Sequence, residues 1–124
     1  MAEVFGGGQT VAIAKIALDA YVMRHQAIAS NIANIHSDNF RPLQVNFEQQ
    51  LATLDLSAGD AARKLAGVQP FLEETPPQLN MTPGVALDME VVRLNQNTLN
   101  FQALVTAIGK SVSLLSLAAR EGRA

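Results

Sequence analysis

The sequence predicts a mainly α-helical fold, in which two long terminal helices pair as an antiparallel coiled coil, with an extended, partly β middle segment. Two long stretches near the ends carry apolar residues at heptad spacing. Hydrophobic residues make up 48% of the chain and aromatic residues only 5%, a balance that favours helices packed through aliphatic side chains over a β-sandwich. The stretch between them contains prolines and glycines that break long elements.

The first helix is predicted over about residues 10–35, with Thr10 able to cap its start. Spacings of three and four put one set of its side chains on a single face, as in a helix that lies along another helix. This N-terminal seam consists of Val11, Ala14, Leu18, Tyr21, His25, Ile28, Ile32 and Ile35. Ile13, Ile16 and Met23 lie off the seam, and we predict that they form a second buried face.

The joint after the first helix is predicted to be a turn from His36 to Pro42. Asn39 tolerates a left-handed backbone conformation, and Pro42 disfavours a helical conformation for Arg41. Residues 43–47 then alternate apolar and polar, which indicates a short extended segment, and residues 48–56 are compatible with a short helix.

The stretch from Ser57 to Val85 gives weaker signals. Val68, Phe71 and Leu72 favour a strand or short hairpin, and the glycines and prolines exclude a long element. Two interpretations remain open for a segment of this length, namely extended packing against a neighbour and partial disorder.

The second long helix is predicted over about residues 88–119, with Asp88 as its N-cap. Its C-terminal seam is the strongest periodic signal in the chain. It consists of Leu87, Val91, Leu94, Thr98, Phe101, Val105, Ile108, Val112, Leu115 and Ala119. No charged residue occurs from Leu94 to Gly109, and Leu114 and Leu117 face away from the seam. A helix that is apolar on several sides is buried on several sides, so the sequence predicts self-assembly or packing among related subunits.

These elements divide the chain into three parts. Residues 1–35 form the N-terminal helix, residues 36–87 form the joint and the extended or β middle region, and residues 88–124 form the C-terminal helix. The two helices are expected to form an inner layer, and the middle region an outer layer.

Composition excludes several classes of function. A net charge of −2 argues against a nucleic-acid partner or an anionic membrane surface, which need a basic face. The chain has no cysteine, so it forms neither disulfides nor thiolate sites. Residues 1–8 do not resemble a cleaved signal peptide, and no run of about 18 apolar residues predicts a membrane span. Export from the cytoplasm would therefore use a route without a cleaved signal.

The sequence indicates no catalytic, cofactor-binding or metal site. His36, Ser37 and Asp38 are the residue types of a hydrolase triad, but immediate neighbours in a turn rarely converge into a hydrogen-bonded relay. His25 occupies a seam position and has no second ligand at metal-site spacing. The glycines at 6–8 lack the lysine and preceding strand of a phosphate-binding loop. We therefore predict that the protein is not an enzyme, and a hydrolase using Ser37 is a distant alternative.

Asn31 and Asn34 lie in the last turn of the first helix, where asparagine is a mediocre helix former. Two interpretations are open. The amides either cap the end of their own helix, or they bond a neighbouring backbone across an interface and fix its register, as buried asparagine does in coiled coils.

The joint resembles a signature of the bacterial flagellar axial proteins, the family of rod, hook and hook-associated proteins. The matching string is Ser30-Asn31-Ile32-Ala33-Asn34 followed by Ser37-Asp38-Asn39-Phe40-Arg41. The usual form ends in Thr-Pro-Gly-Tyr and a basic residue, so Asp38 replaces the proline, while Asn39 and Phe40 keep the turn and the ring. The short length and the segment Val85–Glu90 with Asn97 and Phe101 are similar to the rod members.

This resemblance implies a structural subunit that is exported unfolded by the flagellar type III apparatus and polymerises helically in the periplasm. The resulting tube transmits torque around a central export channel. The implied partners are copies of the chain, other rod proteins and the ring-to-rod adaptor at the membrane ring. The expected assembly residues are Leu18, Tyr21, Ile28, Asn31, Ile32, Asn34, Asn39, Phe40, Leu94, Phe101, Val105, Ile108, Val112 and Leu115. The alternative is a soluble helical adaptor or export-chaperone-like module that binds a partner helix.

Overall fold

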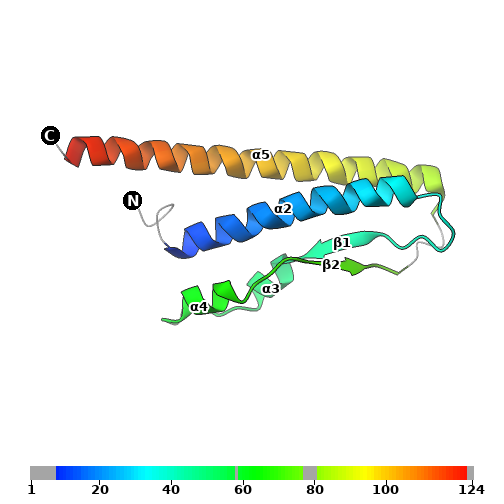
Figure 1. Ribbon diagram of the computed structural model, residues 1–124, viewed down its shortest axis with the longest axis horizontal. Coiled ribbons are helices and arrows are strands. Elements are labelled where there is room, and N and C mark those ends of the chain that lie inside the picture. Colours follow the sequence, from blue (N-terminus) through cyan, green and yellow to red (C-terminus); the bar gives the residue numbers. More distant parts are fainter. Residues whose placement is uncertain (1–7, 58, 77–80, 123–124) are drawn as a thin grey trace.

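The computed structural model describes residues 8–57, 59–76 and 81–122, and it is elongated and mainly helical (Figure 1). The order of elements is α2 (Gly8–Asn34), β1 (Leu43–Asn46), α3 (Glu48–Ala52), α4 (Ala61–Ala66), β2 (Phe71–Glu74) and α5 (Pro83–Gly122). Helix α2 lies between α5 on one side and the layer of β1, β2, α3 and α4 on the other. The mainly α fold class with a partly β middle is thereby confirmed.

The second buried face predicted for the first helix is confirmed. Ala20 and Ala27 of α2 are buried in one cluster with Val45 and Phe47, and Ile16 and Met23 pack against this cluster. The two alanines carry only a methyl group, so the strand can approach the helix closely. Helix α2 is therefore covered by α5 and by the middle layer at the same time.

The joint contains the predicted turn. The N–H of Ser37 donates to the carbonyl of Asn34 at 2.9 Å, which ends α2. Asn39 has a φ of 56°, the left-handed conformation that its sequence position predicted. Pro42 is buried, and the chain enters β1 directly after it.

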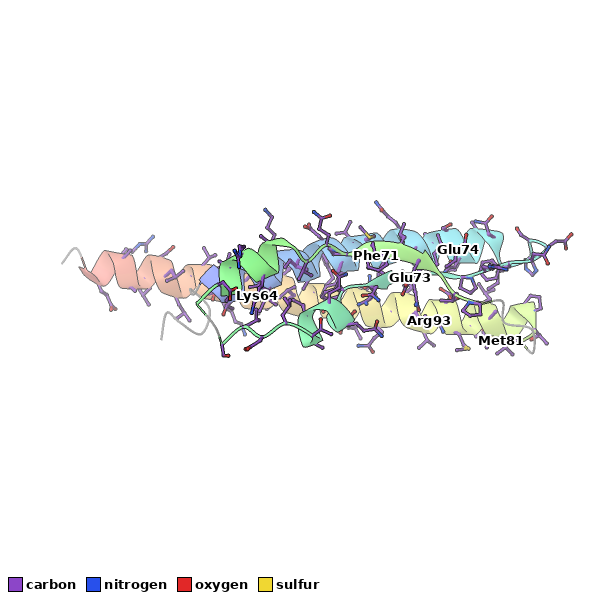
Figure 2. All side chains as sticks on the ribbon, turned by 90° about the horizontal axis from the view of Figure 1, so that it is seen from below. Lys64, Phe71, Glu73, Glu74, Met81 and Arg93 are labelled. Atoms are coloured by element: carbon purple, nitrogen blue, oxygen red, sulfur yellow. The ribbon has the colours of Figure 1, made fainter. Side chains whose placement is uncertain are left out.

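Within its described residues, the middle region contains a two-stranded sheet. Residues 58 and 77–80 of the segment for which two interpretations were open lie outside the described residues. Strands β1 and β2 pair antiparallel with Val45 opposite Leu72, and the N–H of Thr75 extends the ladder to the carbonyl of Pro42 at 2.8 Å. The predicted extended segment and the strand near Phe71 are thus confirmed. Figure 1 and Figure 2 show this hairpin running along α2, which it contacts.

Two short helices connect the strands. Helix α3 covers only the first part of the predicted segment 48–56. Helix α4 was not predicted, because its six residues are too few to show a period. It places Leu65, which is only 1% exposed, against the rest of the fold. Burial of that single side chain therefore fixes an element whose own sequence carries little signal.

Helix α5 begins at Pro83, five residues before the predicted start at Asp88. Proline is well suited to the first helical position, because its N–H would have no helical partner there. Thr82 caps the helix: its hydroxyl accepts from the N–H of Val85 at 3.3 Å and its carbonyl from the N–H of Ala86 at 2.9 Å. The pair Pro83-Gly84 therefore starts the helix and does not break it, so the prediction of Asp88 as the N-cap is wrong.

An ion pair joins α2 to the middle layer. Arg24 contacts Glu48 at 2.6 Å, and its guanidinium lies 5.1 Å from the centroid of the Phe47 ring. Burial alone raises the pKa of Glu48, but the hydrogen bond and charge of Arg24 and the backbone N–H groups of Glu48 and Phe47 outweigh it and hold the pKa below the ordinary value of 4.5.

Acid should weaken this contact. A carboxylate whose pKa is lowered by folding stabilises the fold above its unfolded pKa, and this stabilisation is lost as the pH falls through the lowered value. We expect Glu48→Gln to have a lower denaturation midpoint than the parent at pH 7, and the difference to shrink as the pH falls from 4.5 toward 3. A difference that stays constant with pH would contradict this.

Candidate assembly surfaces

Polar side chains fix the register between α2 and α5. Asn31, which is 3% exposed, donates from Nδ2 to a carboxylate oxygen of Glu90 at 3.2 Å. Glu90 is 2% exposed and also receives the guanidinium of Arg93 at 2.5 Å. One further contact lies about two turns along, where Asn97 Nδ2 donates to the carbonyl of Tyr21 at 2.8 Å. Sliding one helix past the other would leave buried polar groups without partners, which is costly.

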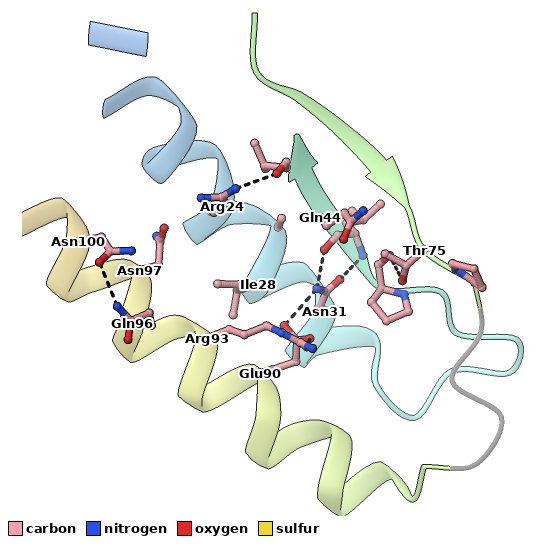
Figure 3. A pocket seen from close by; sticks show the side chains of 15 residues that line it. Arg24, Ile28, Asn31, Gln44, Thr75, Glu90, Arg93, Gln96, Asn97 and Asn100 are labelled. Carbon is pink, nitrogen blue, oxygen red and sulfur yellow. Dashed lines mark hydrogen bonds and ion pairs between the residues drawn. The ribbon is translucent and has the colours of Figure 1, made fainter. Parts of the chain in front are cut away.

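Asn31 also holds the hairpin. Its side-chain amide accepts from the N–H of Leu43 at 2.8 Å and donates to the carbonyl of Leu43 at 2.9 Å (Figure 3). These are the two bonds that a residue of a neighbouring strand would make with Leu43. The amide thus joins α2, β1 and α5 at one point. The interpretation of Asn31 as an amide that fixes register is supported within the chain, whereas Asn34 donates only to Ser30 one turn earlier in its own helix.

The face of α5 that meets α2 differs from the predicted C-terminal seam. Leu94, Phe101 and Ile108 are half-buried, as predicted. Val105, between Phe101 and Ile108, is not, because it is 45% exposed. Val112 and Leu115 are 57% and 47% exposed because they lie beyond the start of α2, as the pairing of Asn97 with Tyr21 shows. On the N-terminal seam, Val11 and His25 are likewise exposed, and Leu18, Tyr21, Ile28 and Ile32 are buried or half-buried.

Buried polar side chains turn a different face of α5 toward α2 from the one that the apolar seam predicted. Glu90 and Asn97 are seven residues apart and buried, so they and Leu104 occupy the heptad position that Val91, Thr98 and Val105 were predicted to fill. The sequence contained this signal as two polar residues one heptad apart. A heptad assignment that uses only apolar residues places Glu90 and Asn97 outside the predicted contact face. The roles of Val105, Val112 and Leu115 between copies stay predictions.

A polar groove of about 590 Å³ lies between α5, α2 and the hairpin (Figure 3). Its floor includes Ala27, Ile28 and Val45, and its α5 wall carries Gln96 and Asn100, which bond each other at 3.0 Å. The Oδ1 atom of Asn97 is buried without a hydrogen-bond partner among the described residues. Its charged lining residues are Arg24, Arg93 and Glu90; Arg93 pairs with Glu90, and Arg24 pairs with Glu48.

The remainder of α5 is apolar and uncovered. Side chains project from both of its flanks along its length, as Figure 2 shows. At 1.5 Å per residue, its 40 residues span about 60 Å, against about 40 Å for the 27 residues of α2. Its C-terminal turns consequently project past the start of α2 (Figure 1). The exposed large side chains of α5 are Val85, Met89, Val91, Val92, Leu99, Val105, Val112, Leu114, Leu115 and Leu117.

By length and composition alone, α5 is apolar enough to cross a membrane, with a mean hydropathy of 1.4 over its most apolar window. This differs from the expectation of no such span. None of that window is buried, so the helix is not the covered core helix that passes the same test in many soluble proteins. The described residues therefore leave the apolar surface of this part of α5 exposed.

The structure does not bring the residues of the joint together as a catalytic site. His36, Ser37 and Asp38 are all exposed, and no side-chain hydrogen bond joins them in the part of the chain that the structure describes. Phe40 is half-buried beside them. Over the same described ranges, no group of three His, Asp or Glu side chains is placed to hold a metal ion.

Comparison with protein-family models and with curated proteins finds no match to this sequence.

Proposed function

We propose that this chain is a structural subunit of the flagellar basal-body rod, of the proximal type that lies nearest the membrane ring. In this role it polymerises helically with copies of itself and with other rod proteins. The assembly forms a drive shaft around the export channel. The proposal includes an antiparallel coiled-coil inner layer, made by α2 and α5, and an outer layer made by the hairpin and the short helices.

The observation that carries the proposal is the uncovered surface of α5. The chain exposes 8523 Å² in total. A compact monomer of 13.2 kDa exposes about 6,400 Å², so about 2,100 Å² is in excess. Obligate protein interfaces bury about 2,000–5,000 Å². The excess is of the size that contacts between subunits would bury, and α5 supplies its apolar part.

Two features favour subunits over a membrane as the covering. The N-terminal half of α5 turns Arg93, Gln96 and Asn100 toward the polar groove, and charged or amide groups are expensive in hydrocarbon. Lys110 then carries a charge in the apolar half. The joint signature, with Asn39 in the left-handed turn, supports the axial family as the setting.

Val105→Asp tests the proposal in the source organism. Val105 is 45% exposed, so the carboxylate costs the single subunit little, whereas a charge buried between subunits is strongly destabilising. We expect basal bodies without a rod and loss of motility in this variant, seen by cryo-EM and a swimming assay. Val105→Thr, which keeps the shape without a charge, should assemble rods.

Two results would count against this function. Intact rods in a strain carrying Val105→Asp would contradict the assembly role of this flank, and intact rods after deletion of the gene would remove the rod assignment. The alternative, a soluble helical adaptor or export-chaperone-like module, predicts a small oligomer of fixed size for the purified chain, whatever its concentration.

A further inference from the structure

Two unlike surfaces of the chain are uncovered and match each other. The first is a shallow groove along one flank of α5, here called the α5 groove. It is lined by Leu99, Gln102, Ala103, Thr106, Lys110 and Leu114, together with Ala107 and Ser111 in its floor. The small side chains in its centre allow a second helix to approach closely. Ala107 and Ser111 are half-buried, so the groove is continuous with the contact between α5 and α2.

The second surface is a row of exposed side chains on α2, here called the α2 stripe. It consists of Asp19, Val22, Gln26, Ala29 and Ala33, which are spaced by three and four residues and therefore share one face. All five are exposed, so this face is covered neither by α5 nor by the hairpin. The stripe has one charge, at its N-terminal end.

The α5 groove has the complementary pattern in the opposite chain direction. Lys110 is its one charge, and Thr106, Ala103 and Leu99 follow toward the N-terminus at spacings of four, three and four. When the two rows are laid antiparallel with Asp19 opposite Lys110, Gln26 faces Ala103 and Ala29 faces Leu99. A large side chain then meets a small one at successive levels, as interdigitating helices require.

The charges fit the same register. Asp19 and Lys110 are exposed and make no ion pair with one another or with any other residue in the described parts of the chain. In the antiparallel register described above, Asp19 of one copy and Lys110 of the next would form an ion pair across the contact. Neither row contains another charge, so no charged side chain would face an apolar one elsewhere in the contact.

We infer that the α5 groove of one copy receives the α2 stripe of the next copy, antiparallel and with Asp19 opposite Lys110. This rests on the proposed function, and it names the surfaces through which the copies meet. When each copy uses its groove toward one neighbour and its stripe toward another, both surfaces stay in use along the whole assembly. Such a head-to-tail contact repeats from copy to copy and builds an open helical array when its rotation does not close a ring.

Cysteine pairs test the register on the full chain, which has no native cysteine to compete. Within one chain, position 21 lies beside position 97, so positions 29 and 99 are separated by about 15 Å along the helices, too far for a disulfide. Ala29→Cys with Leu99→Cys should therefore oxidise only between copies. We expect a ladder of dimers, trimers and longer products on a non-reducing gel.

The matched control combines Ala29→Cys with Val112→Cys. Val112 is also exposed, but on the other flank of α5, so this pair should give no ladder. A ladder from both pairs would show unspecific oxidation and overturn the register. A product that stops at the dimer would overturn the open arrangement in favour of two copies that exchange the same contact reciprocally. Absence of any linked product from the first pair would overturn the contact itself.

Charge reversal provides a second measurement. Lys110→Glu and Asp19→Lys should each lower the yield of the ladder about fivefold by replacing attraction with repulsion, and the combined variant should restore it. Failure of restoration would overturn the pairing of these two residues. If the ladder is absent while Val105→Asp still abolishes rods, the rod function stands and this contact falls. If the ladder forms while rods survive deletion of the gene, the contact stands and the rod function falls.

Discussion

Phe47→Ala is expected to lower the free energy of unfolding of the middle layer by about 3–5 kcal/mol, the usual cost of removing a buried phenylalanine. Phe47 is 4% exposed and lies in the cluster that joins the hairpin to α2. Its ring meets that of Tyr21 edge-on at 6.1 Å between centroids, and Arg24 lies over its face. The substitution thus removes the apolar burial, the aromatic contact and the cation–π contact together.

Chemical denaturation measures the loss in the free energy of unfolding, and hydrogen exchange shows in which elements the loss occurs. We expect faster exchange in β1 and β2 than in the α2 segment beside Asn97, because α2 and α5 keep their own polar contacts. Phe71→Ala is the matched control: Phe71 is 47% exposed, and its loss should change stability by less than about 1 kcal/mol. Equal effects of the two substitutions would contradict the assignment of Phe47 as the anchor of the middle layer.

Asn31→Ala is expected to lower the free energy of unfolding by about 2–4 kcal/mol. The side chain bonds both backbone groups of the half-buried Leu43 and one carboxylate oxygen of the buried Glu90. Its removal leaves these backbone groups without their partner and Glu90 with Arg93 alone. Each unsatisfied buried group costs about 1–3 kcal/mol, and the groups share one neighbourhood, so their costs do not simply add.

Asn34→Ala is the natural control, since both asparagines belong to the same signature and the same helical turn. The side chain of Asn34 is exposed and bonds only Ser30. We expect a change of less than about 0.5 kcal/mol, with a gain in helix propensity offsetting the lost bond. Urea denaturation of both variants checks the pair, and a loss of stability at position 34 as large as that at position 31 would contradict it. Asn34 remains available for a contact between copies.

Most of the secondary structure could be predicted from the sequence, because local periodicity and turn chemistry decide it. The long helices, the left-handed turn at Asn39 and the extended segment before Phe47 all follow from residue types over short distances. The start of α5 at Pro83 was also a local feature, and it was missed because proline and glycine were taken as breakers and not as the first turn. Helix α4 was missed because burial of Leu65 decides it.

The rotation of α5 about its axis was the part that only the tertiary structure decided. The heptad pattern fits two adjacent faces of this helix almost equally well, since apolar residues occur on both. The buried pairing of Asn31 with Glu90, and of Asn97 with the backbone of Tyr21, selects one face and leaves Val91 and Val105 outside. By itself, the sequence determined that this chain has two long helices with more apolar surface than one partner helix can cover. Contacts between residues far apart in the chain decided which of that surface stays uncovered, because buried hydrogen bonds are directional and hydrophobic burial is not.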